Sequence, residues 1–152
     1  MGSTYIIPIY RGFLIVGVDG EYVTSIRYTE SRLEPLIPED GPGRLIYRYC
    51  MGEMIDLSRL KVRYPYGSLF DHRVWNIVRG VKYGEVKSYR WVAERLGNAK
   101  YVRAVGRSLS RNPILIVVPC HRIIRSDGSI GGFRAPGGVG LKMFLLRLEG
   151  SI

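Results

Sequence analysis

The hydrophobic and polar positions of this chain follow two different periods. Near the N-terminus, three short runs rich in Tyr, Ile and Val are separated by turn pairs and predict antiparallel strands over Thr4–Ile9, Phe13–Val18 and Tyr22–Tyr28. A proline-containing loop, a helix over Arg44–Met51 and a short strand over Leu60–Tyr64 are expected to follow. From Leu69 onward the apolar residues recur every three or four positions, which is typical of helices.

The change of period predicts a mixed α/β (α+β) fold in two domains. Residues 1–66 are expected to form a small N-terminal domain, built from a three-stranded antiparallel sheet and a helix. Residues 67–152 are expected to form a mainly helical C-terminal domain. A chain of 152 residues, of which 46% are hydrophobic, is large enough to fill a core of this kind.

Two short helices around a Gly-Asn turn predict a helix-turn-helix in the second half. Ser88 is a good N-cap for a helix over Tyr89–Leu96, and Gly97 ends that helix. Asn98 then caps a second helix over Ala99–Ser110.

The second of these helices carries a row of basic residues. Its buried stripe is predicted to consist of Val102, Val105 and Leu109. Another face holds four basic residues at spacings of three and four, namely Lys100, Arg103, Arg107 and Arg111. Beside them stand the small residues Ala104, Gly106 and Ser108. Because like charges four residues apart repel, an unpaired basic row favours an anionic partner over an ordinary solvated face.

Charge is distributed unevenly along the chain. The net charge is +10, yet residues 1–66 hold 8 basic and 8 acidic side chains, whereas residues 67–152 hold 15 and 5. A one-sided basic surface is typical of a protein that meets a polyanion. Nucleic acid is favoured over membrane, because no basic amphipathic helix of membrane type is present. The alternative is a merely soluble basic surface. The basic residues are mostly arginine and glutamine is absent, which indicates a thermophile.

The cysteines and histidines are few. Two cysteines are too few for a disulfide framework and suit a reducing compartment. The longest apolar run is too short to span a membrane. A cytoplasmic protein is therefore expected. The four possible zinc ligands are Cys50, His72, Cys120 and His121. They lack the close paired spacings of zinc sites, so no metal is predicted.

The stretch from Asn112 to Ile124 is the centre of the predicted chemistry. Five apolar residues, Ile114–Val118, predict a fully buried strand that Pro119 ends. Cys120 and His121 follow directly, at a place where a thiol would be held in fixed geometry and still be reached by a substrate. The alternative is that Cys120 is one more small core residue.

A histidine and a carboxylate complete the candidate site. Neighbouring side chains point in different directions, so His121 is expected to reach the Cys120 thiol through a water or across a tight turn rather than head-on. Glu149 stands in the last turn of a closing helix with the apolar stripe Leu141, Phe144, Leu145 and Leu148. The helix dipole disfavours an anion there, so a nearby cation is expected. A carboxylate on the far ring nitrogen would make His121 a better base and leave Cys120 partly ionised at neutral pH.

Four motifs of the second half resemble those of the O6-alkylguanine-DNA alkyltransferases. They are Gly84-Glu85-Val86-Lys87-Ser88-Tyr89, Arg103-Ala104-Val105-Gly106, Asn112-Pro113 and Pro119-Cys120-His121-Arg122-Ile123. The resemblance covers Leu69 to Gly150 with matched spacing. Over residues 1–66 it rests only on length and strand order.

The resemblance implies a protein that flips a damaged guanine out of duplex DNA and takes its O6-alkyl group irreversibly, once per molecule and without a cofactor. Cys120 would be the alkyl acceptor, with O4-alkylthymine as a second candidate substrate. His121 would be the water-mediated base and Glu149 its partner. Tyr89 would donate a proton to the departing guanine, and Asn112 would tie the recognition helix to the site.

The same resemblance implies the DNA contacts and the alkyl pocket. Arg103 would fill the gap left in the base stack. The other expected DNA contacts are Ser88, Lys100, Ala104, Arg107, Arg111 and Arg122. The pocket would be formed by Pro119, Ile123, Phe133 and Arg134. Family members commonly have a Tyr-Ser pair where this chain has Phe133-Arg134, so the hydroxyl contacts to guanine are expected to differ.

The expected partner is double-stranded DNA carrying an alkylated guanine, bound by a monomer. A first alternative is a non-catalytic helix-turn-helix DNA-binding protein with an inert Cys120. A second is a cysteine hydrolase, which would turn over an ester or amide continuously.

Overall fold

The computed structural model describes residues 2–131 and 137–152 of the chain. Three antiparallel strands open it, β1 (Gly2–Ile9), β2 (Gly12–Asp19) and β3 (Tyr22–Thr29), and they confirm the predicted meander. The predicted three-stranded sheet has a fourth member, because the short strand β4 (Lys61–Val62) pairs in parallel with β3. The sheet order is therefore β1-β2-β3-β4.

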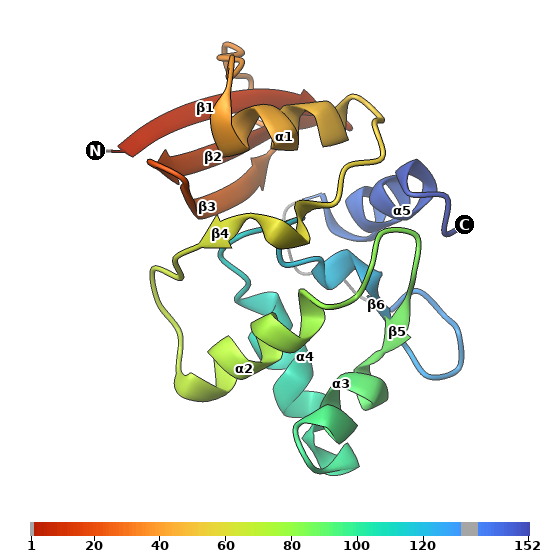
Figure 1. Cartoon of the computed structure of the whole chain (residues 1–152). Coiled ribbons are helices and arrows are strands. Elements are labelled where there is room, and N and C mark those ends of the chain that lie inside the picture. The colour runs from red at the N-terminus through yellow and green to blue at the C-terminus, as the bar shows by residue number, and fades with distance from the viewer. Residues whose placement is uncertain (1, 132–136) are drawn as a thin grey trace.

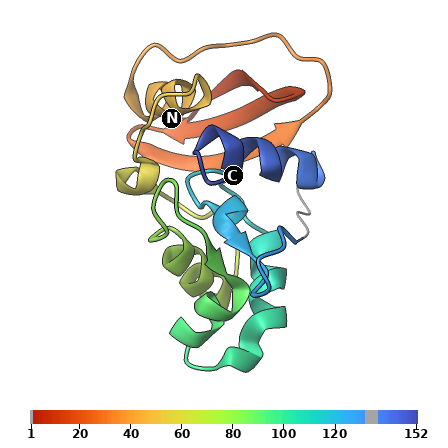
Figure 2. The same cartoon turned by 90° about the vertical axis from the view of Figure 1, so that its right-hand side faces the viewer.

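Helix α1 (Gly41–Cys50) lies over one face of this sheet (Figures 1 and 2). A proline in its first turn suits a helix start, where the missing N–H is not needed. Ile46 and Tyr49 of α1 are fully buried, and they belong to the same core as Leu14 and Val16 of the sheet. The first half of the chain thus forms a sheet covered by one helix, as the sequence predicted.

The rest of the structure is mainly helical. Its helices and strands are α2 (Leu69–Val78), β5 (Lys87–Ser88), α3 (Tyr89–Arg95), α4 (Val102–Ser110), β6 (Ile123–Ile124) and α5 (Gly138–Leu148). Short 3₁₀ turns occur at η1 (Leu57–Arg59), η2 (Ala99–Tyr101) and η3 (Cys120–Arg122). Figure 1 shows α2, α3 and α4 grouped away from the sheet, with α5 between that group and the sheet. None of the helices in the described part of the chain is long and apolar enough to cross a membrane.

Local capping positions α3 and α4. The Ser88 side chain accepts a hydrogen bond from the backbone N–H of Trp91 (2.9 Å), and Asn98 accepts one from the backbone N–H of Lys100 (2.9 Å), so both predicted caps are confirmed. The helix predicted over Ala99–Ser110 begins as the 3₁₀ turn η2 and becomes α-helical only at Val102.

The strand predicted over Ile114–Val118 is wrong, although the segment is buried as expected. The chain folds into a tight turn in which the N–H of Val118 donates to the carbonyl of Ile114 (2.9 Å). Ile116 lies at a φ of 74°, a left-handed conformation that is strained for a β-branched residue. A run of buried apolar residues has no period of its own, so it cannot distinguish a strand from a buried turn.

One end of this turn is nevertheless attached to the sheet. The N–H of Ile26 in β3 donates to the carbonyl of Pro113 (3.0 Å), and the N–H of Leu115 donates to the carbonyl of Ile26 (3.1 Å). The segment that leads to Cys120 is therefore anchored to β3 by backbone hydrogen bonds.

The predicted buried stripe of α4 is partly wrong. Val105 and Leu109 are buried, but Val102 is 37% exposed and Ser108 is fully buried in its place. The Ser108 hydroxyl donates to the carboxylate of Asp71 in α2 (2.6 Å), and its carbonyl accepts from the Trp75 indole (2.8 Å). Both partners of Ser108 belong to α2, so the inward face of α4 is turned toward that helix. The buried Ser108 hydroxyl is tolerated because it is hydrogen-bonded.

Candidate active site and nucleic-acid interface

Cys120 lies at the start of η3, directly after the tight turn, and is only 5% exposed. The Asn112 side chain holds this arrangement together. Its amide nitrogen donates to the Cys120 sulfur (3.1 Å) and to the carbonyl of Val118 (2.8 Å), while its oxygen accepts from the N–H of Ile114 (2.9 Å). One side chain thus fixes both the strained turn and the thiol.

The surroundings of Cys120 favour the neutral thiol over the thiolate. Burial raises its pKa, and this effect outweighs the hydrogen bond from Asn112 and the positive charge of Lys142, which both lower the pKa. This direction argues against the partly ionised thiol that was expected from the sequence. The thiol needs a base to become a nucleophile.

His121 is a suitable base, and its tautomer is set by Glu149. Since a carboxylate only accepts, Nε2 of His121 donates to Oε2 of Glu149 (2.9 Å). Its Nδ1 is buried and has no hydrogen-bond partner in the described part of the chain. Burial lowers the pKa of His121, against the raising effect of Glu149, so the ring is neutral and Nδ1 carries a free lone pair. No direct bond joins Nδ1 to Cys120, as expected for neighbouring residues.

Glu149 is buried and accepts hydrogen bonds from three side chains, those of His121, Arg122 and Tyr49. Arg122 donates from Nε to Oε1 and from Nη2 to Oε2 (2.8 Å each), and the hydroxyl of Tyr49 in α1 also donates to Oε2. Burial acts to raise the pKa of Glu149, but the hydrogen bonds and charges of His121 and Arg122 outweigh it and hold the pKa well below its usual range. The cation expected near Glu149 is therefore present, and it is Arg122.

This placement contradicts the expected role of Arg122 in DNA binding. Its side chain is buried, its Nη1 donates to the carbonyl of Val81 (2.8 Å), and its guanidinium carbon lies 5.8 Å from the centre of the Tyr83 ring. A guanidinium that neutralises a buried carboxylate is not available to a phosphate. Arg122 is a structural member of the His-Glu cluster.

Two further side chains approach the thiol. Burial raises the pKa of Tyr89, and the Cys120 charge adds to this effect. Lys142 of α5 is fully buried, donates to the carbonyl of Ile123 (2.6 Å), and lies with its nitrogen 5.8 Å from the centre of the Tyr89 ring. Burial lowers the pKa of Lys142 to about 8, although the Cys120 charge raises it. A buried cation next to a cysteine favours the thiolate once a proton acceptor is available.

Two of the four residues predicted to form the alkyl pocket lie within the described part of the chain. Pro119 and Ile123 are buried on either side of Cys120 and His121, and Phe133 and Arg134 lie outside the described residues.

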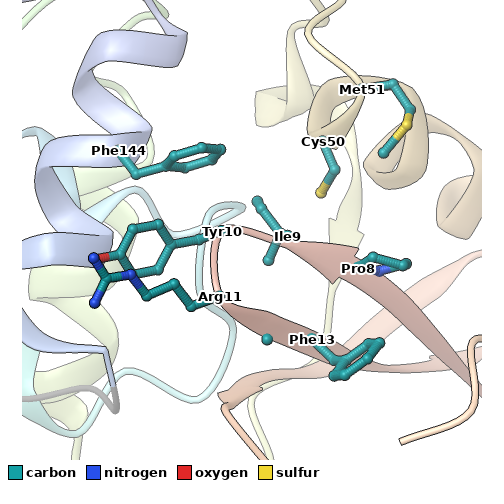
Figure 3. Close-up of a pocket in the computed structure, with 9 residues that line it drawn as sticks. Pro8, Ile9, Tyr10, Arg11, Phe13, Cys50, Met51 and Phe144 are labelled. Carbon is teal, nitrogen blue, oxygen red and sulfur yellow. The ribbon is translucent and has the colours of Figure 1, made fainter. Parts of the chain in front are cut away.

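A shallow hollow of about 550 Å³ lies elsewhere, between the β1–β2 turn, α1 and α5. Figure 3 shows Tyr10 and Phe144 at one end of it and Cys50 on its wall. Burial raises the pKa of Cys50 to about 12, which disfavours the reactive thiolate form.

The exposed face of α4 is basic. Lys100, Arg103 and Arg107 are exposed, and within residues 2–131 and 137–152 no acidic side chain pairs with them. Ala104 is half-buried beside them, and a side chain at Gly106 would meet open space. A surface of this kind suits the approach of a phosphate backbone.

Two other predicted DNA contacts already have partners in the fold. Arg111 pairs with the buried Asp71 (2.6 Å), so one of the four residues in the predicted basic row already has an acidic partner. Ser88 is half-buried and its hydroxyl caps α3. Among the described residues, no three His, Cys, Asp or Glu side chains gather as a metal site.

Three buried polar residues of this region were not predicted from the sequence. Asp71 joins α2 to α4, Tyr49 reaches Glu149 from α1, and Lys142 lies near Cys120. Only Asp71 had a local signal, because Ser68 and Asp71 form a capping box at the start of α2. The other two depend on contacts between residues far apart in the sequence.

A helix-turn-helix with a basic face, next to a buried cysteine and a His-Glu pair, defines a class of DNA-binding proteins with a thiol site. The chain belongs to the 6-O-methylguanine DNA methyltransferase family, whose DNA binding domain matches residues 69–151. A methylated-DNA–protein-cysteine methyltransferase of Haemophilus influenzae is 37% identical over 91% of this chain and 80% of its own length. One from Metallosphaera sedula is 36% identical over 99% of this chain and 93% of its own length.

Solved structures agree in fold. An OGT of Mycobacterium tuberculosis in complex with DNA superposes with a TM-score of 0.81 at 30% identity, covering 97% of this chain and 92% of that chain. An O6-methylguanine methyltransferase of the same organism gives a TM-score of 0.79 at 32% identity, over 99% of this chain and 94% of that chain. The predicted fold class and the predicted family are confirmed.

Proposed function

We propose that this protein repairs O6-alkylguanine in duplex DNA by one-way transfer of the alkyl group to Cys120. The observation that carries the proposal is the cluster of Cys120, Asn112, His121 and Glu149, in which a thiol, a hydrogen-bond donor to it and an oriented neutral base lie together. Relatives that span most of the chain are named as methyltransferases acting from methylated DNA to a protein cysteine. The basic face of α4 provides the surface for DNA.

The transfer step conserves atoms and charge. The Cys120 sulfur forms a bond to the alkyl carbon, the bond from that carbon to guanine O6 breaks, and its electron pair stays with the guanine. The thiol proton passes through a water to Nδ1 of His121, which is the ring nitrogen left without a partner. The departing guanine takes a proton from the Tyr89 hydroxyl, and Tyr89 and His121 return to their resting forms by exchange with solvent.

Electrostatics favours this step once the base is in place. The Asn112 amide and the charge of Lys142 both stabilise the thiolate form of Cys120, and Glu149 stabilises the imidazolium form of His121. The raised pKa of Tyr89 keeps that hydroxyl protonated until an anionic leaving group develops beside it.

The proposal includes base flipping. A thiol that is only 5% exposed cannot reach a base stacked inside a duplex, so the guanine must leave the helix to meet it. Arg103 is exposed on α4 and would fill the gap in the stack, while Lys100, Ala104 and Arg107 would lie along the backbone. Flipping costs a few kcal/mol, which contacts of this kind offset.

We also propose the division of labour between the two predicted domains. Residues 67–152 would bind DNA and transfer the alkyl group, since they contain α3, α4 and Cys120. Residues 1–66 would support the site through β3 and α1. A monomer suffices, because one chain holds the thiol, the base and the carboxylate, and a reducing cytoplasm would keep the thiol available.

The decisive experiment is intact-mass measurement after incubation with an oligonucleotide duplex containing O6-methylguanine. The mass of the wild-type protein should rise by one methyl group, which peptide mapping should place on Cys120. Cys120→Ala should bind the duplex and gain no mass. Binding without a mass change in the wild-type protein would leave a non-catalytic DNA-binding protein, and repeated turnover of an ester would indicate a hydrolase.

A further inference from the structure

We infer that Tyr49 is a positioning residue of the alkyl-transfer site, which acts through Glu149 to set the basicity of His121. Tyr49 belongs to α1 in the first half of the chain, one hundred residues away from Glu149 in the sequence. The inference rests on the proposed function, in which His121 accepts the thiol proton. Under this inference, a residue from the first half of the chain influences the proton transfer at the site.

The contact between Tyr49 and Glu149 is buried and well oriented. Tyr49 is fully buried, Glu149 is nearly so, and the phenol hydroxyl donates to Oε2 of the carboxylate. The ring of Tyr49 packs edge-on against Tyr83, with ring centres 6.0 Å apart at an angle of 83°. Tyr83 in turn donates to the carbonyl of Leu148, the residue before Glu149 (3.3 Å). Two tyrosines therefore fix the end of α5.

The hydroxyl of Tyr49 is a permanent donor. Burial and the neighbouring charge of Glu149 raise the pKa of Tyr49 well above its ordinary value, so the hydroxyl stays protonated throughout the working pH range. If α1 needed only an aromatic residue here, phenylalanine would fill the same space without a polar atom to satisfy. The hydroxyl has its one acceptor in the carboxylate that orients the base.

Competition for the same oxygen connects Tyr49 to His121. Oε2 of Glu149 accepts from Tyr49, from Nη2 of Arg122 and from Nε2 of His121. Each donor withdraws charge from the carboxylate and weakens the support that Glu149 gives to the protonated imidazole. Removing the Tyr49 hydroxyl should therefore raise the pKa of His121.

The other charged groups around His121 define what the experiment must hold constant. Arg122 and Lys142 both lower its pKa, and Glu149 raises it. Tyr49→Phe leaves these three side chains and the aromatic packing in place. Tyr47→Phe is the matched control on the same helix, because the Tyr47 ring stacks on Arg44 (4.7 Å) and its hydroxyl makes no hydrogen bond within the described part of the chain.

The first readout needs no activity. The chain contains two histidines, so nitrogen-15 NMR of the imidazoles resolves His121 from His72. The His121 titration should move up by about half a unit, a threefold change in proton affinity, in Tyr49→Phe and not in Tyr47→Phe. In a Glu149→Gln background the Tyr49→Phe shift should disappear. An unmoved titration in Tyr49→Phe, or a shift that survives Glu149→Gln, would overturn the inference.

The second readout is the pH profile of single-turnover transfer from free O6-benzylguanine. Its acidic limb should move to higher pH by the same half unit in Tyr49→Phe, while the alkaline limb, set by the Tyr89 hydroxyl that protonates the departing guanine, stays in place. Tyr49→Met replaces Tyr49→Phe if that variant fails to fold, with the same expected shift. Failure of the wild-type protein to take the benzyl group would refute the proposed function, whereas a wild-type protein that reacts and a variant with an unmoved acidic limb would refute only the role of Tyr49.

Discussion

Replacing Asn112 with alanine should show whether the side chain that caps the tight turn also activates the thiol. The Asn112 amide makes three hydrogen bonds, two to backbone groups of the turn and one to the Cys120 sulfur. The first two stabilise the fold around Ile116, whose left-handed backbone is strained. The third acts on the reacting atom. The two roles should therefore appear in different measurements.

The magnitudes follow from the contacts. Two backbone hydrogen bonds are worth about 1 kcal/mol each, and loss of support for a strained residue adds on the order of 1 kcal/mol, so Asn112→Ala should lower the unfolding free energy by about 3 kcal/mol. A hydrogen bond to a charged sulfur is worth about 1.5–3 kcal/mol. Its loss should slow alkyl transfer by roughly 10- to 100-fold.

Urea unfolding and single-turnover transfer from O6-benzylguanine measure the two effects separately. Asn98→Ala is a matched control, because Asn98 donates nothing to the site and only caps η2 with one hydrogen bond (2.9 Å). The control should lose about 1 kcal/mol of stability and keep the wild-type rate. If folded Asn112→Ala reacts as fast as the control, then Asn112 is a turn cap only and the thiolate does not depend on its amide.

Three other predictions concern stability, DNA and the thiol. Asp71 has its pKa brought to about 2, because hydrogen bonds from Ser108 and Arg111 outweigh burial. The unfolding free energy of the wild type should therefore exceed that of Asp71→Asn by about 2 kcal/mol at pH 7. The difference should fade as the pH drops from 4 to 2, because the Asp71 carboxylate is then protonated. A difference that stays constant would show that it does not come from the ionised carboxylate. Arg103→Ala should slow repair of O6-methylguanine in a duplex far more than reaction with free O6-benzylguanine, and equal losses would contradict its place in the stack. Native Cys120 should resist iodoacetamide at neutral pH, as followed by mass spectrometry, and rapid labelling would contradict a protonated, buried thiol.

The features that could be predicted from the sequence are those with local causes. The strands have Tyr, Ile and Val between turn pairs, and the structure pairs them in the predicted order. Ser88 and Asn98 cap the segments that they precede, because a short polar side chain satisfies N–H groups two or three residues ahead. The dipole at the end of α5 likewise required a cation near Glu149.

The features that could not be predicted depend on tertiary contacts. The run Ile114–Val118 became a turn because Asn112 and β3 supply its hydrogen bonds from outside the run. Arg122 was expected at the DNA surface, because its motif position does not reveal that its side chain turns inward to Glu149. Tyr49 has no signal of its own in the sequence, since its partner lies in the last turn of the chain.

A protonated resting thiol suits a protein that can react only once. A permanently ionised Cys120 would combine with any small electrophile, and each such event would consume a molecule that cannot be regenerated by turnover. Burial removes that hazard by raising the pKa of Cys120, and the neutral His121 nearby allows ionisation at the moment of attack. The buried carboxylate of Glu149 must then hold His121 in one tautomer without making the imidazole so basic that it is protonated before the thiol gives up its proton. We infer that Arg122 and Tyr49, which donate to the same Glu149 carboxylate, limit how strongly it raises the basicity of His121.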